Sequence, residues 1–233
     1  MTLKNICIIP ARGGSERLPK KNIINFFGKP MISYTIEAAI KSGCFKKIFV
    51  SSDDKKTLEI ASNYKIEICK RDKKYARNKI RVSDVIIDFI KKQNKKEFYF
   101  DNITCLFPTA PLRGAKDILN VVKNINAKSC HFSLAVTKYN LPPHQALKIN
   151  KNRIVKPFWP KLVNKRDEQI GDLVVDNGST YSAYVPAFMK TKHFFGSPLK
   201  VHIMKYQRSI DINTSEDLEL AKYFFQKLKI HEY

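Results

Sequence analysis

The sequence predicts an α/β fold in which a mostly parallel sheet is flanked by helices, built as a single domain over residues 1–233. Short apolar runs alternate with amphipathic segments along the first two-thirds of the chain. Strands that alternate with helices form parallel sheets covered by helices. A chain of 233 residues with 43% hydrophobic residues is long enough for one domain with a sizeable core.

The apolar runs are read as strands because each is too short for a helix and fits a buried strand. Strands are expected at 6–9, 47–51, 66–69, 103–106, 132–136, 180–185 and 201–204. A shorter extended piece at 23–27 precedes a turn at 28–30, where glycine and proline end it.

The segments between these runs carry helical spacing and residues typical of helix ends. Apolar residues recur on one face at 32–40, 58–61, 82–89, 118–125 and 218–224. Gly43 is placed to end the first of these helices, since glycine adopts the left-handed conformation that closes helices. The polar runs 52–54 and 214–217 stand directly before two helices, where a side-chain oxygen can cap the first turn.

The alternation stops from about residue 140 to 176. This stretch holds two proline-containing turns and short apolar pieces around 149 and 154, a pattern typical of a hairpin with loops. On the residues alone, an ordinary surface insertion accounts for it.

The net charge of +22 comes from 34 Lys and only 9 Arg, scattered along the whole chain. A dispersed lysine excess is typical of a solvated surface and argues against specific nucleic-acid binding, although it can steer small anions to the protein. No apolar run approaches the about 18 residues of a membrane span. We therefore expect no membrane partner.

The N-terminus leads directly into a strand, without the apolar segment of a secretion signal. The five cysteines are odd in number and widely spaced, and they include no Cys-x-x-Cys pair. Buried thiols are expected rather than disulfides or a zinc site. These features together predict a cytoplasmic protein.

The most informative segment is the loop 10–22, Pro-Ala-Arg-Gly-Gly-Ser-Glu-Arg-Leu-Pro-Lys-Lys-Asn, which follows the first strand. Gly13 and Gly14 leave room for backbone N–H groups to turn toward an anion. Arg12 and Lys21 supply positive charge. The spacing differs from both the P-loop and the dinucleotide-binding glycine pattern. The loop therefore predicts a polyphosphate site, against the alternative of a basic surface turn.

Several polar or restricted residues follow predicted strands directly, namely Arg12, Asp53, Arg71 and Pro108. Because the carboxyl ends of parallel strands meet at one edge of a sheet, we expect these residues to converge. Pro108 belongs to a second motif at 107–113, Phe-Pro-Thr-Ala-Pro-Leu-Arg. Its two prolines restrict φ, and Arg113 supplies a permanent cation.

A third motif, Ser-Ile-Asp-Ile-Asn-Thr at 209–214, precedes the last helix. In a strand, Asp211 and Asn213 would point to the same face. Two oxygen ligands there could hold Mg²⁺ beside the oxygens of a triphosphate. Alternatively, Asn213 and Thr214 only cap the helix.

These motifs resemble those of sugar nucleotidyltransferases that use CTP, and among them the acylneuraminate cytidylyltransferases. The loop 10–22 is similar to that family's signature, and 107–113 matches its Gln-Pro-Thr-Ser-Pro-Leu-Arg except at Phe107 and Ala110. The resemblance covers residues 5 to about 225. It implies a Rossmann-like fold and Mg²⁺-dependent transfer of CMP from CTP to the anomeric hydroxyl of an acidic nine-carbon sugar, with release of pyrophosphate. It also implies that 140–176 is a dimerisation arm of a homodimer.

The resemblance assigns roles to individual residues. Catalysis is expected of Arg12, Lys21 and Asp211, and metal binding of Asp211 and Asn213. Nucleotide binding is expected of Ala11, Arg12, Gly13, Gly14, Ser15, Lys21, Asn22 and Arg71. Sugar binding is expected of Phe107, Thr109, Arg113, Arg166, Asn177, Tyr181, Phe194 and Phe195.

Some residues depart from the family pattern. Phe107 replaces a glutamine that faces the sugar, Gln145 and Val175 replace a lysine and an arginine, and Asn213 replaces an aspartate. An apolar side chain at 107 would leave polar groups of a mismatched sugar unpaired. The acceptor is therefore expected to differ from N-acetylneuraminic acid, and a 9-deoxy sugar of legionaminic or pseudaminic type is favoured.

Three other readings stay open on the sequence. A CMP-Kdo synthetase also carries Ser-x-Arg-Leu-Pro in its loop, as at 15–19 here. A sugar-1-phosphate nucleotidyltransferase would use UTP or GTP. A non-catalytic nucleotide-binding protein would account for Asn213 and for the unusual residues near Arg77.

Overall fold

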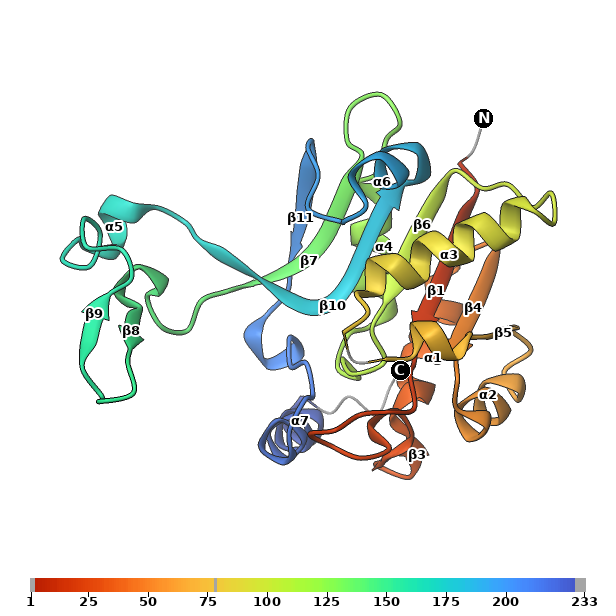
Figure 1. The fold of residues 1–233 in the computed structure, drawn as a ribbon, viewed down its shortest axis with the longest axis horizontal. Helices are drawn as coiled ribbons and strands as arrows, with labels where there is room; N and C mark the ends of the chain where they lie inside the picture. The colour runs from red at the N-terminus through yellow and green to blue at the C-terminus, as the bar shows by residue number, and fades with distance from the viewer. Residues whose placement is uncertain (1–2, 78, 229–233) are drawn as a thin grey trace.

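The computed structural model describes residues 3–77 and 79–228. Its sheet has the strands β1 (Asn5–Pro10), β4 (Lys47–Ser52), β5 (Glu67–Lys70), β6 (Asn102–Leu106), β7 (Phe132–Lys138), β10 (Val174–Tyr184) and β11 (Leu199–Ile203). They are ordered β11–β7–β10–β6–β1–β4–β5 (Figure 1). All neighbours are parallel except β10, which runs antiparallel to both β6 and β7. The prediction of a mostly parallel sheet is confirmed.

Helices cover both faces of this sheet. They are α1 (Met31–Ser42), α2 (Lys55–Ser62), α3 (Val82–Asn94), α4 (Ala115–Lys123) and α6 (Val185–Thr191). The last helix, α7 (Ser215–Lys227), packs instead against β2 and the start of α1. Alternate side chains of a strand point to opposite faces: Cys7 and Ile9 pack with α1, α2 and α4, whereas Ile6 and Ile8 pack with α3 and α6. β1 is buried on both faces, and the predicted strands and helices are found close to their expected ranges.

Short elements complete the described chain. They are the 3₁₀ helices η1 (Lys21–Ile23), η2 (Lys73–Tyr75), η3 (Pro143–Gln145) and η4 (Tyr206–Arg208), the strands β2 (Asn25–Phe26), β3 (Lys29–Pro30), β8 (Leu147–Ile149) and β9 (Val155–Pro157), and the helix α5 (Asp167–Ile170). The expected extended piece at 23–27 is thus divided between η1 and β2. The turn lies at residues 27–28 and not at the expected 28–30, because Lys29 and Pro30 form β3 and pair with β2.

The predicted helix ends are confirmed. Gly43 closes α1 at φ +63°, in the left-handed region. Asp54 caps α2 by accepting the Thr57 N–H at 2.8 Å. Thr214 accepts the Asp217 N–H at 3.3 Å, and the Asp217 carboxylate accepts the Thr214 N–H at 3.0 Å. Reciprocal bonds of this kind satisfy donors that the first turn leaves unpaired.

The segment before α7 differs from its prediction. Residues 209–213 form an extended loop and not a strand. Its backbone is tied to the second motif, because the Ile212 N–H donates to the Thr109 carbonyl at 2.8 Å. Ile210 and Ile212 are buried beside α7. Asp211 and Asn213 nevertheless lie together, as expected for residues two positions apart in extended backbone.

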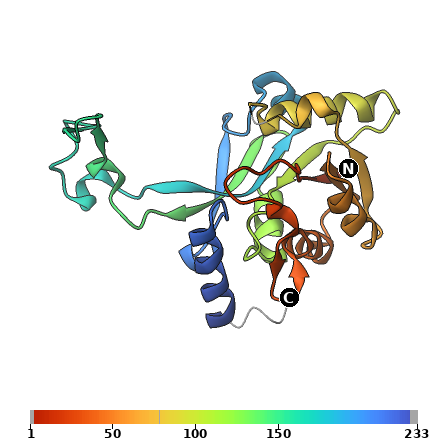
Figure 2. The ribbon, with the colours of Figure 1, turned by 60° about the horizontal axis from the view of Figure 1, so that its bottom comes forward.

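The stretch between β7 and β10 projects from the body as an arm, residues 139–173 (Figures 1 and 2). It contains the antiparallel pair β8–β9, which confirms the expected hairpin, and the short helix α5. The expected boundary at 176 is too late, since Val174 already pairs with Lys138 in the sheet. Large hydrophobic side chains are exposed on the arm, among them Leu147, Ile149, Ile154, Val155, Phe158 and Trp159.

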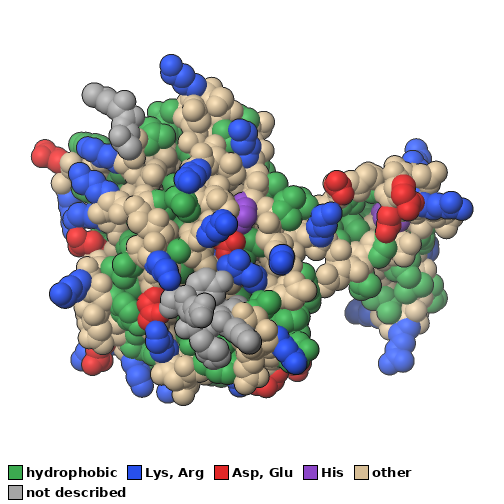
Figure 3. All heavy atoms as spheres, turned by 180° about the vertical axis from the view of Figure 1, so that it is seen from behind, with side chains coloured by type: hydrophobic (Ala, Val, Ile, Leu, Met, Phe, Trp, Pro, Cys, Tyr) green, Lys and Arg blue, Asp and Glu red, His purple; other side chains and the backbone are tan. Residues whose placement is uncertain are grey.

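The surface carries its positive charge in a dispersed form. On the face seen in Figure 3, Lys and Arg side chains are spread over both body and arm. The five cysteines are free thiols, and Cys7, Cys105 and Cys130 are buried. Among the helices of residues 3–77 and 79–228, none is long and apolar enough to cross a bilayer.

Candidate active site

The loop after β1 is fastened to the end of β4. The Ala11 N–H donates to the Ser51 carbonyl at 2.9 Å, and the Gly13 N–H donates to Asp53 Oδ1 at 3.0 Å. A Cβ on Gly13 would lie 2.9 Å from the Asp54 Cβ, so a side chain does not fit there. The N–H groups of Ala11 and Gly13 are thus engaged within the protein, and the nucleotide binding expected of both residues stays a prediction. These residues fix the path of the loop.

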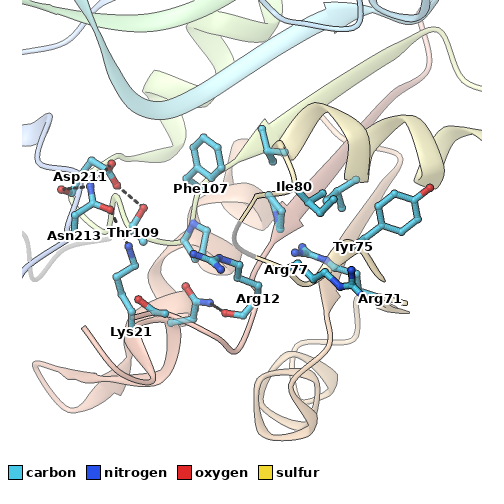
Figure 4. Close-up of a pocket in the computed structure, with 16 residues that line it drawn as sticks. Arg12, Lys21, Arg71, Tyr75, Arg77, Ile80, Phe107, Thr109, Asp211 and Asn213 are labelled. Carbon is cyan, nitrogen blue, oxygen red and sulfur yellow. Dashed lines mark hydrogen bonds between the residues drawn. The ribbon is translucent and has the colours of Figure 1, made fainter. Parts of the chain in front are cut away.

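A pocket of about 290 Å³ opens at the carboxyl edge of β1, β4, β5 and β6 (Figure 4). Nine of the predicted site residues line it: Arg12, Ser15, Lys21, Asn22, Arg71, Phe107, Thr109, Asp211 and Asn213. They come from four separate segments of the chain. The structure thus brings the three sequence motifs together, as the position of each after its strand or before α7 predicts.

At one end of the pocket, the side-chain amide of Asn213 forms hydrogen bonds both to the Asp211 carboxylate and to two cationic side chains. Asp211 accepts from Thr109 Oγ1 at 2.5 Å and from Asn213 Nδ2 at 2.7 Å. The other atom of the same amide, Asn213 Oδ1, accepts from Lys21 Nζ and from Arg17 Nη2, each at 3.0 Å. Among the described residues, Asp211 is the only carboxylate that lines the pocket.

The cations of the pocket are partly removed from water. Burial lowers the pKa of Lys21, and the nearby Arg17 and Arg12 lower it further against the opposing charge of Asp211. Burial is also the main cause that lowers the pKa of Arg71, whose Nη2 donates to a backbone carbonyl of β4 at 2.8 Å. Closely placed cations disfavour one another's charge, and an incoming anion relieves this. The pocket therefore suits a polyanion.

The other end of the pocket lies between β5 and α3, where Tyr75, Arg77, Ile80, Val82 and Val85 face the cavity (Figure 4). The resemblance implied cytosine contacts near Arg77 and Val82 but left them open, since these residues depart from the family pattern. Tyr75, Ile80 and Val85 were not predicted. This wall could have been predicted from its place in the sequence, because residues 72–85 follow β5 at the same edge of the sheet where Arg71 was expected.

The motif at 107–113 is held from inside the protein. The Phe107 N–H donates to the Ser179 carbonyl at 3.0 Å. Arg113, only 2% exposed, donates from Nη1 to the carbonyls of Ser179 at 2.8 Å and Phe107 at 3.3 Å. The expectation that Arg113 contacts the sugar is not met, because its guanidinium is buried behind the loop and shapes it.

Two polar residues of β10 are also turned away from the pocket. Tyr181 donates its hydroxyl to the Asp176 carboxylate, at 2.8 and 2.7 Å, and its ring meets Phe107 edge to face. Asn177 donates to Ser209 Oγ at 3.2 Å and is buried. Neither residue lines the cavity. In place of the expected sugar contacts, Tyr181 bonds to Asp176 of the same strand, and Asn177 bonds to Ser209 in the loop that leads to Asp211.

The remaining predicted sugar residues do not line the pocket. Phe194 is buried and packs against Phe188. Phe195 is 59% exposed and lies 6.5 Å from Tyr181, centroid to centroid. Arg166 is exposed, directly precedes α5 on the arm, and does not line the pocket. Gly14 is exposed on the loop, beside the cavity and not in its lining.

Fold and pocket together define the class: an α/β protein with a pocket rich in cations at the carboxyl edge of its sheet. A family model described as cytidylyltransferase matches residues 6–168. The chain is 34% identical to the pseudaminic acid cytidylyltransferase of Campylobacter jejuni, over 96% of this chain and 97% of that one. It is 31% identical to the CMP-N,N'-diacetyllegionaminic acid synthase of Legionella pneumophila, over 94% and 95% of the two chains.

A solved structure supports the same fold. The structure of CMP:2-keto-3-deoxy-manno-octonic acid synthetase complexed with CTP superposes with a TM-score of 0.72 at 15% identity, covering 97% of this chain and 99% of the other. At that identity the likeness shows the fold alone. With the family match and the relatives above 30% identity, the chain belongs to the cytidylyltransferase family, and it is a nucleotidyltransferase enzyme.

Proposed function

We propose that the protein transfers CMP from CTP to the anomeric hydroxyl of a nonulosonic acid and releases pyrophosphate. The observation that carries the proposal is the meeting of Arg12, Lys21 and Arg71 with the carboxylate of Asp211 in one pocket. The similarity to enzymes named for pseudaminic and diacetyllegionaminic acid supports an acidic sugar as acceptor.

The residues present suit a direct displacement. The anomeric hydroxyl oxygen would form a bond to the α-phosphorus of CTP and lose its proton to water, as the bond from the α-phosphorus to the oxygen it shares with the β-phosphate breaks and pyrophosphate leaves. Arg12 and Lys21 would neutralise the charge that grows on the phosphate oxygens. Holding both substrates in one pocket supplies the remaining rate gain through orientation.

The donor set fits magnesium. Mg²⁺ takes oxygen ligands and is commonly held by one or two carboxylates together with substrate phosphates. Asp211 supplies one carboxylate and Asn213 an amide oxygen at the pocket's wall. In the described residues no three His, Cys, Asp or Glu side chains gather as a metal cluster, so the triphosphate would supply the other charges. Bound there, the ion would polarise the phosphate oxygens.

The apolar wall around Phe107 supports a sugar of pseudaminic or legionaminic type. The Phe107 ring lines the pocket and is backed by Tyr181, so the wall offers no hydrogen bond at that point. A 9-deoxy sugar has an apolar end that suits such a wall. Sugars with a hydroxyl at that end would bury it unpaired.

The arm supports a homodimer as the active assembly. Its exposed hydrophobic side chains, such as Phe158 and Trp159, are of the kind that a protein partner covers. A second copy would also bring Arg166 of one chain toward the pocket of the other. The cytoplasm is the proposed location, since five unpaired thiols suit a reducing compartment.

We expect pyrophosphate release to require CTP, Mg²⁺ and an acceptor sugar together. All nucleoside triphosphates make the same contacts through their phosphates, so selectivity for CTP must come from the part of the pocket that contacts the base. Initial rates would be measured with CTP, UTP and GTP, each with and without sugar and with EDTA. Turnover with UTP or GTP equal to that with CTP would make the cytidylyl assignment wrong.

We expect a pseudaminic or legionaminic acid to be used with a higher kcat/KM than N-acetylneuraminic acid. A hydroxyl left unpaired against an apolar wall costs about 1–3 kcal/mol, which corresponds to about a five- to a hundredfold difference. A panel of nonulosonic acids and Kdo with CTP and Mg²⁺ measures this directly. The best rate with N-acetylneuraminic acid would contradict it.

A further inference from the structure

The carboxamide of Asn213 connects two parts of the site that are far apart in the sequence. Its oxygen accepts from Lys21 Nζ and Arg17 Nη2, both at 3.0 Å, and its nitrogen donates to Asp211 Oδ2 at 2.7 Å (Figure 4 shows the contacts of Lys21 and Asp211). The orientation of the amide is set by charge. Turning it over would place N–H donors against two cations and an oxygen against a carboxylate.

The amide oxygen is a neutral acceptor for two positive charges. In the described part of the chain, neither Lys21 nor Arg17 forms an ion pair within 4.0 Å. Both cations are therefore held by a neutral acceptor without a direct ion pair, so they remain available to an anionic ligand.

We propose that Asn213 is a positioning residue that holds Lys21 and Arg17 of the nucleotide loop against the Asp211 segment and releases them to the triphosphate of CTP. Phosphate oxygens are stronger acceptors for these cations than a neutral amide. On nucleotide binding the two donors exchange Asn213 Oδ1 for phosphate, and the loop closes on its substrate from a prearranged position. The role in CTP binding rests on the function proposed above.

The neutrality of the residue is the important property in this role. An aspartate at 213 would form ion pairs with Lys21 and Arg17 in the protein without nucleotide. The triphosphate would then have to break these pairs, and it would also meet a second carboxylate beside Asp211. The hydrogen bonds to asparagine order the loop in the protein without nucleotide, and they are weak enough to be replaced by bonds to phosphate when CTP binds.

The ordering of the loop is tested on the protein without nucleotide or metal, by amide hydrogen exchange of residues 12–20. We expect exchange to be about fivefold slower in Asn213→Asp, where ion pairs replace neutral contacts, and about fivefold faster in Asn213→Ala. Asn63→Asp, an exposed position at the far end of α2, adds the same charge and should leave exchange unchanged. Equal loop exchange in the wild type and both Asn213 variants would overturn the positioning role.

The release to phosphate is tested by CTP titration calorimetry in EDTA. We expect Asn213→Asp to bind CTP about tenfold more weakly than the wild type and Asn63→Asp to bind it equally. Weaker binding without slower loop exchange would mean simple repulsion of the triphosphate and would overturn the proposal. If the wild type binds no CTP either in EDTA or with Mg²⁺ in its place, the proposed function fails, while the exchange experiment still decides whether Asn213 orders the loop.

Discussion

Replacing Asp211 with asparagine is expected to reduce pyrophosphate release to background while the protein stays folded. Asp211 is the only carboxylate lining the pocket among the described residues, and both of its oxygens accept hydrogen bonds at the wall. Asparagine keeps the shape and removes the charge that would hold Mg²⁺. Removing one such electrostatic contribution in other active sites costs about a hundred- to a thousandfold in kcat.

The measurement is a Mg²⁺ titration of initial rate at saturating CTP, with the melting temperature recorded for each variant. Asp88→Asn on α3 is a matched control, because it removes a carboxylate from a partly exposed ion pair with Lys92, outside the pocket. Such pairs contribute at most about 1 kcal/mol to stability, and the control should keep full activity. An Asp211→Asn enzyme with wild-type turnover would place the metal elsewhere.

Replacing Lys21 with methionine is expected to lower kcat/KM for CTP by about ten- to a hundredfold or more. A charge-assisted hydrogen bond to phosphate contributes about 1.5–3 kcal/mol. Lys21 lies at the pocket wall, so methionine retains the stem that packs there while removing the ammonium group. Arg12→Ala is expected to have an effect of the same size for the same reason.

Lys20→Met provides the matched control for Lys21. Lys20 is the preceding residue of the same loop, is exposed, and does not line the pocket. Steady-state kinetics of the variants, with circular dichroism to verify folding, separate a local contact from the general positive charge of the loop. Equal losses in Lys20→Met and Lys21→Met would show that only that general charge matters.

The strand and helix positions could be predicted because burial and capping leave direct traces in sequence. β1 is apolar at consecutive positions since both of its faces are covered, and Gly43 and Thr214 mark helix ends by their backbone chemistry. The start of β10 was missed because its register shifts between Asp176 and Tyr181, which interrupts the alternation. The loop at 209–213 was misread because buried Ile210 and Ile212 imitate a strand, although their backbone bonds lead to another loop.

Site residues could be predicted from the sequence where a charged side chain stands at a position that is usually not charged. Cations that closely follow strands, such as Arg12 and Arg71, stand at the edge of a parallel sheet where ligands commonly bind. Arg113 and Asn177 show the limit of this argument, since both are polar groups that satisfy buried partners. From the sequence alone, a polar residue that bonds to a buried group of the protein looks the same as one that binds a ligand. Ile80 and Val85 were missed because apolar residues near a helix read as core.

The way Arg113 holds the loop has a consequence for how enzymes of this shape can diverge. At position 107 the main chain is anchored on both sides, through its N–H to Ser179 and through its carbonyl to Arg113. The side chain at that position has no part in these bonds. Residue 107 can therefore change between an aromatic and an amide side chain while the loop keeps its conformation. A single substitution at this position can thus alter which sugar the pocket accepts.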